Sequence, residues 1–169
     1  IGHAALSSAT TASNNTAVGR QALYANTTGA ANTAVGKSAL LDNTTGTNNV
    51  AMGENALANN TTAAQNTGLG QNSLLTNTTG ASNVAVGHDA LRLNTTASNN
   101  IAVGVDALRA NTTGTINVAV GSLALDANQT GSASTAVGYG AGSAFTADGL
   151  TAFGKDALEL CTTGINTAV

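Results

Sequence analysis

Large and charged side chains are scarce in this chain. Of its 169 residues none is proline or tryptophan, aromatic residues make up 2% and charged residues 8%, against a charged share of about 25% in ordinary globular domains. Low charge with few large apolar residues also occurs in disordered segments. Here, however, the apolar residues recur at fixed positions, so we predict a narrow core of Ala, Val and Leu that extends along an axis.

The scarcity of basic residues argues against two classes of partner. The five Lys and Arg residues are scattered along the chain, and the net charge is −3. Nucleic acids and anionic membranes bind to basic faces, so neither is expected as a partner. No apolar run approaches the roughly 18 residues of a membrane span, so membrane insertion is not expected.

Side chains that carry catalysis are equally sparse. The one cysteine, Cys161, stands where other units have Asn26 or Asn43, and we interpret it as a tolerated substitution. No Cys and His cluster has metal-binding spacing. Acid–base catalysis needs paired groups of displaced pKa, whereas single carboxylates fall in different units, at Glu54, Asp89, Asp106 and Asp156. We expect no enzyme, no metal site and no cofactor.

One stretch, Asn-Thr-Ala-Val-Gly, returns at a fixed period. Its closing glycines are 17 residues apart, at Gly19, Gly36, Gly53, Gly70, Gly87, Gly104, Gly121 and Gly138; the next step, to Gly154, is 16. The whole unit reads Gly-x-x-Ala-Leu-x-x-Asn-Thr-Thr-Gly-x-x-Asn-Thr-Ala-Val. Such a period is typical of a solenoid, in which each unit buries its apolar face only against its neighbours.

Two positions of the unit are apolar almost throughout and are predicted to stack as core ladders. The Val position holds Val18, Val35, Met52, Leu69, Val86, Val103, Val120 and Val137, and the Leu position holds Leu23, Leu40, Leu57, Leu74, Leu91, Leu108 and Leu125. The residue before the Val position is Ala or Gly in every unit, which indicates a close contact.

Thr-Ala-Val predicts a short strand, because the Thr position accepts only β-branched residues and alternate side chains then face opposite sides. The Gly-x-x-Ala-Leu-x-x segment is a second strand or one helical turn. We favour the strand, since a lone turn is costly to nucleate. Asn-Thr-Thr-Gly makes the bend, with a positive φ expected at Gly29, Gly46, Gly80, Gly114, Gly131 and Gly164. The Asn that precedes the strand, as in Asn32 and Asn49, either forms a buried ladder or sits in an exposed turn.

The predicted architecture is an all-β, parallel β-roll of about 17 residues per coil, with a regular array over 1–137 and degenerate repeats continuing it over 138–169. Stacked coils lie about 4.8 Å apart, so ten units form a rod of roughly 48 Å. The chain begins and stops in mid-motif, which indicates a segment of a longer array. One Leu and one Val per coil make a thin core against the backbone entropy of 17 residues. Lateral association, for instance as a homotrimer, would bury an apolar stripe between chains.

The motif in Asn32-Thr33-Ala34-Val35-Gly36 resembles the Asn-Ser-Val-Ala-Ile-Gly motif of YadA-like head repeats in trimeric autotransporter adhesins. The 17-residue form, continuing through Ala39-Leu40 to Asn43-Thr44-Thr45-Gly46, also looks like arrays in bacteriophage tail fibres. The resemblance implies a left-handed, trimeric β-roll. It further implies an extracellular location on a virion or bacterial cell surface, and attachment to a host-surface receptor or glycan.

The leading functional hypothesis is therefore a structural attachment fibre that spaces or presents a receptor-binding element. An alternative is an ice-binding solenoid, in which pairs such as Thr27-Thr28 and Thr44-Thr45 stack into ranks; adjacent Thr residues on a strand would, however, face opposite sides. Less favoured is a polysaccharide-degrading tailspike segment, because no carboxylate pair can be named for it. Asn-x-Thr sequons at Asn26, Asn43, Asn77, Asn94 and Asn111 are explained by turn chemistry as well as by glycosylation.

Overall fold

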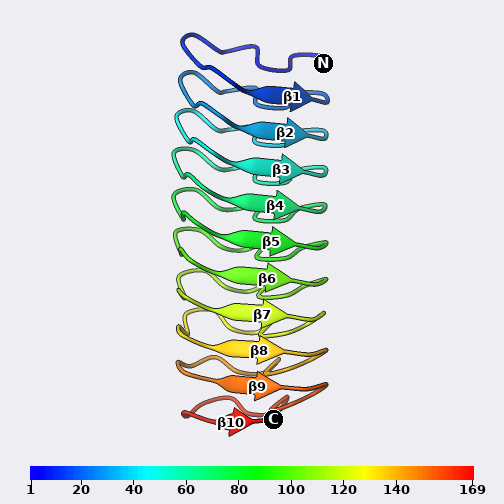
Figure 1. Ribbon diagram of the computed structural model, residues 1–169, viewed down its shortest axis with the longest axis vertical. Coiled ribbons are helices and arrows are strands. Elements are labelled where there is room, and N and C mark those ends of the chain that lie inside the picture. The colour runs from blue at the N-terminus through cyan, green and yellow to red at the C-terminus, as the bar shows by residue number, and fades with distance from the viewer.

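The computed structural model describes residues 1–169 and contains one parallel sheet and no helix. Its strands stack in sequence order from the N-terminus to the C-terminus (Figure 1). They are β1 (Thr16–Val18), β2 (Thr33–Val35), β3 (Val50–Met52), β4 (Thr67–Leu69), β5 (Val84–Val86), β6 (Ile101–Val103), β7 (Val118–Val120), β8 (Thr135–Val137), β9 (Thr151–Phe153) and β10 (Thr167–Ala168). The predicted all-β solenoid with about 17 residues per coil is confirmed.

Equivalent positions of successive repeats lie directly over one another. Ala34 pairs with Ala51 between β2 and β3, and the next residue pair is Val35 with Met52. The shortened repeat keeps this register, since Val137 of β8 pairs with Phe153 of β9. The missing residue is therefore absorbed outside the strands, and the sheet continues unbroken to β10.

The Gly-x-x-Ala-Leu-x-x segment is neither the second strand that we favoured nor a helical turn. It is a run of turns in which two alternate residues have a positive φ, as at Asp89 (57°) and Leu91 (50°). The Asp89 amide donates to Gln71 O of the preceding coil, at 3.1 Å, and the Leu91 amide to Ala107 O of the next coil, at 3.0 Å. The segment does not form a strand, yet its backbone still hydrogen-bonds to the coils on both sides.

The predicted positive φ at the glycine of Asn-Thr-Thr-Gly is wrong for Gly29, Gly46, Gly80, Gly114 and Gly131 and confirmed for Gly164, where φ is 94°. In the regular coils a positive φ occurs at the coil-closing glycines instead, where φ lies between +133° and +138° from Gly19 to Gly138. A Cβ at Gly70 would also lie 2.6 Å from the carbonyl carbon of Gly87 in the next coil. The chain turns sharply at this point, directly against the same turn in its neighbour, so only glycine fits.

The interior is filled from the Leu position and from two Ala positions. All seven predicted Leu residues from Leu23 to Leu125 are fully buried, and so are the strand-centre alanines from Ala34 to Ala152. The Val position is not part of this core. Val18, Val35, Met52, Leu69, Val86, Val103, Val120 and Val137 are intermediate or exposed, because the strand points its central Ala inward and its first and third residues outward.

Two ladders of Asn side chains complete the interior. The Asn residues before the strands are fully buried from Asn32 to Asn117, and they bond mainly to the backbone. The backbone N–H of Asn83 donates to Asn66 Oδ1 at 2.9 Å, for example. Side-chain-to-side-chain bonding instead dominates the other ladder, at the start of Asn-Thr-Thr-Gly. Its members Asn26, Asn43, Asn60, Asn77, Asn94 and Asn111 are linked by Nδ2-to-Oδ1 bonds of 2.8–3.0 Å.

Both ladders converge on one backbone carbonyl in each coil. The Gly80 oxygen accepts from Asn66 Nδ2 at 2.8 Å and from Asn77 Nδ2 at 2.9 Å. A buried polar group is tolerated when its hydrogen bonds are satisfied. The chain can therefore replace bulky apolar residues with amides in a core too narrow for aromatic side chains.

The irregular repeat that begins at Gly138 has different interior side chains, and these still fill the core. Gly142 stands at the Leu position, and a Cβ there would collide with the side chain of Leu150. Leu150 thus fills the space that the missing Leu leaves. Phe145 takes the place of the ladder Asn, and both Phe145 and Leu150 are fully buried. The amide ladders give way to apolar packing at this coil.

A coil-closing glycine that faces another coil should be more sensitive to substitution than one that does not. We expect Gly70→Ala to lower the free energy of unfolding by at least about 2 kcal/mol, because it adds both a disfavoured φ and a backbone clash. Gly154→Ala is the control, since Gly154 has a similar φ of +123° but no atom within 4 Å of an added Cβ, and it should cost about 1 kcal/mol. Urea unfolding followed by circular dichroism measures both values, and equal losses would contradict this account.

Removing one member of the Asn ladder should leave buried partners unsatisfied. Asn77→Ala deletes the donor to Asn60 Oδ1 and the acceptor for Asn94 Nδ2, so we expect a loss of about 2 to 3 kcal/mol. Asn59→Ala, at an exposed position without a side-chain bond, should change stability by less than about 0.5 kcal/mol. The same unfolding measurement compares them, and a neutral Asn77→Ala would show that the ladder does not stabilise the coil.

Candidate functional surfaces

The first long surface is the outer face of the sheet, here called the sheet face. It is formed by the first and third residues of β1 to β9, which are Thr, Val, Ile, Leu, Met or Phe throughout. Several of these side chains are well exposed, including Val18 (38%), Ile101 (40%) and Met52 (45%). No charged residue interrupts them, so the sheet face is a flat, uncharged, largely apolar stripe along the whole solenoid.

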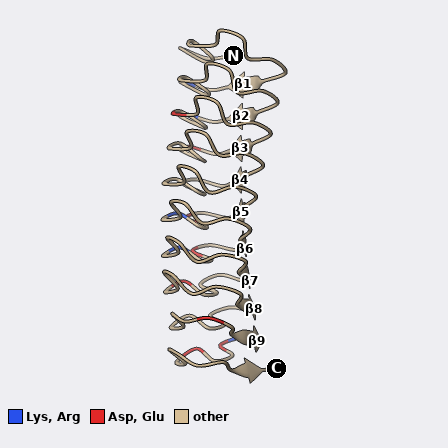
Figure 2. Ribbon diagram, turned by 90° about the vertical axis from the view of Figure 1, so that its left-hand side faces the viewer, with Lys and Arg blue, Asp and Glu red and all other residues tan.

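The charged residues gather away from the sheet face. All of them except Asp148 lie within the six residues that follow a coil-closing glycine. Figure 2 shows the coloured segments concentrated on the turns opposite the strands. This surface is called the charged face below. It carries both acidic and basic side chains and has no extended patch of one sign.

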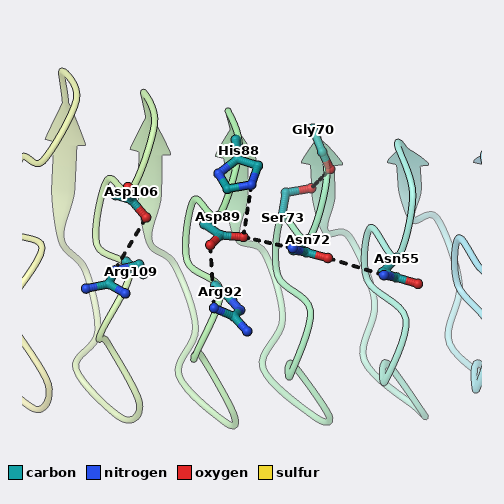
Figure 3. A network of polar contacts seen from close by, with 9 residues as sticks. All are labelled: Asn55, Gly70, Asn72, Ser73, His88, Asp89, Arg92, Asp106 and Arg109. Carbon is teal, nitrogen blue, oxygen red and sulfur yellow. Dashed lines mark hydrogen bonds and ion pairs between the residues drawn. The ribbon is translucent and has the colours of Figure 1, made fainter.

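On the charged face, amide hydrogen bonds join neighbouring coils, and the ion pairs drawn in Figure 3 form within single coils. Asn55 Nδ2 donates to Asn72 Oδ1 at 3.3 Å, and Asn72 Nδ2 donates to Asp89 Oδ1 at 3.0 Å. Arg92 Nη1 lies 3.5 Å from Asp89 Oδ2, and His88 Nε2 lies 3.8 Å from Asp89 Oδ1. These basic side chains are 40–50% exposed, so each pair contributes at most about 1 kcal/mol.

The carboxylates singled out from the sequence each face a cation. Besides Asp89, these pairs are Glu54 with Lys37 at 2.6 Å, Asp106 with Arg109 at 3.4 Å and Asp156 with Lys155 at 3.5 Å. These are ion pairs on the surface. The carboxylates were singled out from the sequence, but their basic partners were not.

One group on the charged face has a displaced pKa. Desolvation raises the pKa of the Asp126 carboxyl above its usual value and nearby Asp106 adds to the rise, while Arg109 opposes it. Asp106, Arg109 and Asp126 therefore interact electrostatically on the charged face. No pocket opens on the surface to hold a substrate beside them, and no three His, Cys, Asp or Glu side chains gather closely enough to bind a metal.

The Thr-Thr pairs form a third surface, in which the two residues differ. The first Thr donates its hydroxyl to a backbone carbonyl of the next coil, as from Thr27 to Thr44 O at 3.0 Å and from Thr44 to Thr61 O at 3.0 Å. The second Thr is exposed from Thr28 to Thr130, and its hydroxyl has no hydrogen-bond partner in the protein. We call this single exposed row the Thr row. Of the Thr pairs that the ice-binding alternative stacks into ranks, only the second residue therefore presents a free hydroxyl.

The Thr row hardly varies, although it is exposed. The second-Thr position holds Thr11, Thr28, Thr45, Thr62, Thr79, Thr96, Thr113, Thr130 and Thr163, with Ala147 the exception. Other exposed positions change freely; the one after the coil-closing glycine holds Arg20, Lys37, Glu54, Gln71 and Val105, for example. The uniform Thr row is thus not explained by burial or by a hydrogen bond within the chain.

The sequons and the cysteine are accounted for by the coil structure. Asn26, Asn43, Asn77, Asn94 and Asn111 are fully buried, so their amides are out of reach of a glycosylating enzyme in the folded chain. Cys161 replaces a ladder Asn near the C-terminus, where Asn166 Nδ2 donates to its sulfur at 3.0 Å. This contact gives Cys161 a structural setting in which no side-chain base contacts the thiol.

Comparison of the chain with protein-family models, curated proteins and solved structures found no match. Among the secondary-structure elements there is also no helix of the length and apolarity that crossing a membrane would take. The class of the protein therefore rests on its geometry, which is that of a parallel β-solenoid with three long surfaces.

Proposed function

We propose that this chain is a segment of an extracellular attachment fibre, on a virion or a bacterial surface, and that it associates laterally with identical chains. The segment spaces or presents receptor-binding elements and carries no catalytic activity. The single observation that carries the proposal is the sheet face, an uncharged apolar stripe left open along every coil.

Lateral association follows from where the apolar side chains lie. Leu and Ala fill the interior, so the Val position cannot enter it and stays outside on a flat sheet. Exposed apolar stripes of this length mark interaction surfaces. A sister chain has the same repeat and can match every rung, which supports a second copy as the occupant.

The resemblance to YadA-like head repeats and tail-fibre arrays supports three chains around a common axis and a left-handed coil. The central sheet faces would then be buried, while the charged face and the Thr row would stay in water. A rod of this kind, with buried amides in place of a bulky core, suits a protein that must hold its shape outside the cell.

A charge on the sheet face should separate the chains. We expect the wild-type segment to sediment at about three times 16.3 kDa. Val103→Lys, on β6, should shift it to the monomer, because a buried unpaired ammonium is strongly unfavourable. Val105→Lys changes an exposed valine two residues further on, on the charged face, and should leave the trimer intact. Analytical ultracentrifugation gives both masses. A monomeric wild type would refute the lateral assembly, as would equal behaviour of the two variants.

A second candidate function, ice binding, is favoured by the Thr row. Its hydroxyls and methyl groups are exposed, unbonded within the chain and repeated at the coil spacing of about 4.8 Å. β-Branched Thr has few rotamers, so the row is rigid and can match a periodic solid. The objection that adjacent Thr residues face opposite sides does not apply, since they lie in a turn and only the second is free.

Ice binding predicts thermal hysteresis that depends on the Thr row. The double variant Thr62→Lys, Thr79→Lys should abolish a freezing gap of the wild type, because two long charged side chains interrupt the row. Gln71→Lys, on the charged face between them, should keep it. Nanolitre osmometry measures the gap. A wild type without a gap rules out this candidate and leaves the fibre proposal untouched.

A further inference from the structure

Aromatic residues concentrate in the one irregular repeat. The chain has two Tyr and two Phe, and three of these four, Tyr139, Phe145 and Phe153, fall within fifteen residues of each other. Phe145 is fully buried and fills the interior, whereas Tyr139 is 53% and Phe153 41% exposed. Packing inside the coil therefore explains Phe145 but not Tyr139.

The surroundings of Tyr139 also differ from those of the regular coils. In regular coils the next residue carries a side chain, such as Asn72 or Asp106. Here it is Gly140, and an added Cβ would lie 2.6 Å from Asp156 Oδ1. The Asp156 carboxylate therefore occupies the space that a side chain fills elsewhere. Asp156 belongs to the coil that follows Tyr139, and its backbone amide donates to Tyr139 O at 2.7 Å.

A cation completes the group. Lys155 Nζ lies 6.0 Å from the centre of the Tyr139 ring, at the outer limit of a cation–π contact, and 3.5 Å from Asp156 Oδ2. Its side chain is 76% exposed, so the ammonium can turn toward a bound molecule. An exposed ring, a carboxylate and an ammonium thus meet on an open surface without a pocket.

We propose that Tyr139, Lys155 and Asp156 form a binding site for a neutral saccharide, a proposal that rests on the attachment function proposed above. The apolar C–H face of a sugar can stack on an exposed aromatic ring such as that of Tyr139. Sugar hydroxyls donate to the Asp156 carboxylate and accept from the Lys155 ammonium. The two charges cancel, which favours a neutral sugar over an acidic one.

The chain offers a matched control for this site. Tyr24 is exposed to a similar degree, 42%, and also lies outside the strands, but in a regular coil where no Lys or Arg stacks on its ring. If any exposed tyrosine sufficed, Tyr24 and Tyr139 would behave alike. If the irregular repeat builds the site, only Tyr139 matters.

The test is binding of the full segment to an array of immobilised neutral and acidic oligosaccharides, with wild type and the variants Tyr139→Ala, Tyr139→Phe, Asp156→Asn and Tyr24→Ala. The expected result is binding of the wild type to a neutral oligosaccharide, weakened about tenfold or more in Tyr139→Ala by loss of the stacking ring. Asp156→Asn should also weaken binding, while Tyr139→Phe and Tyr24→Ala should retain it.

Three results would overturn the site: no neutral oligosaccharide bound by the wild type, a preference for acidic ones, or equal binding by Tyr139→Ala and Tyr24→Ala. Each variant is also sedimented. Because Tyr139 lies off the sheet face, its replacement should not change the mass. Loss of sugar binding with an intact trimer would thus be distinguished from failure of the assembly.

Discussion

Hydrogen bonding from coil to coil is the interaction on which the rest of this structure depends. The strand amides and many turn amides bond to the equivalent region one repeat away, as Leu91 does to Ala107, while other turn amides bond within the coil, as Arg92 does to Asp89. A residue's neighbours are therefore its own counterparts above and below, and each position of the unit becomes a ladder. Any side chain admitted at one position must pack against copies of itself, which explains why the interior holds Ala, Leu and paired amides.

The same constraint determines where the chain accepts unfavourable backbone conformations. Leu91 and its counterparts keep a positive φ, which costs an ordinary residue about 1 kcal/mol or more. Their full burial and the bond to the next coil compensate for it. At Gly70 and the other coil-closing glycines up to Gly138 no compensation is possible, because a side chain would enter the neighbouring backbone. Glycine is thus fixed there by the stacking, while at Gly154 nothing lies within 4 Å of an added Cβ.

These details set the limit of prediction from the sequence. The period, the Thr-Ala-Val strand, the small residue at its centre and the Leu core were predictable, because they follow from spacing and local preference. The turn segment was not, since a left-handed Leu contradicts local propensity and is stable only in the stack. The Val ladder was misassigned because its apolar residues recur as regularly as those of the core. The group around Tyr139 was missed as well: the packing of Asp156 beside Gly140 joins two repeats and leaves no motif.

A ladder also restricts how such a protein can carry function. Because every coil repeats the last, a uniform surface can match only a partner that is itself repetitive, such as a sister chain on the sheet face or a crystal lattice on the Thr row. Recognition of a single compact ligand requires a coil that differs from its neighbours without weakening the stack. The repeat that begins at Gly138 meets both conditions. Leu150 and Phe145 keep its interior filled and β8 to β10 stay in register, so its exterior is free to carry a distinct set of side chains.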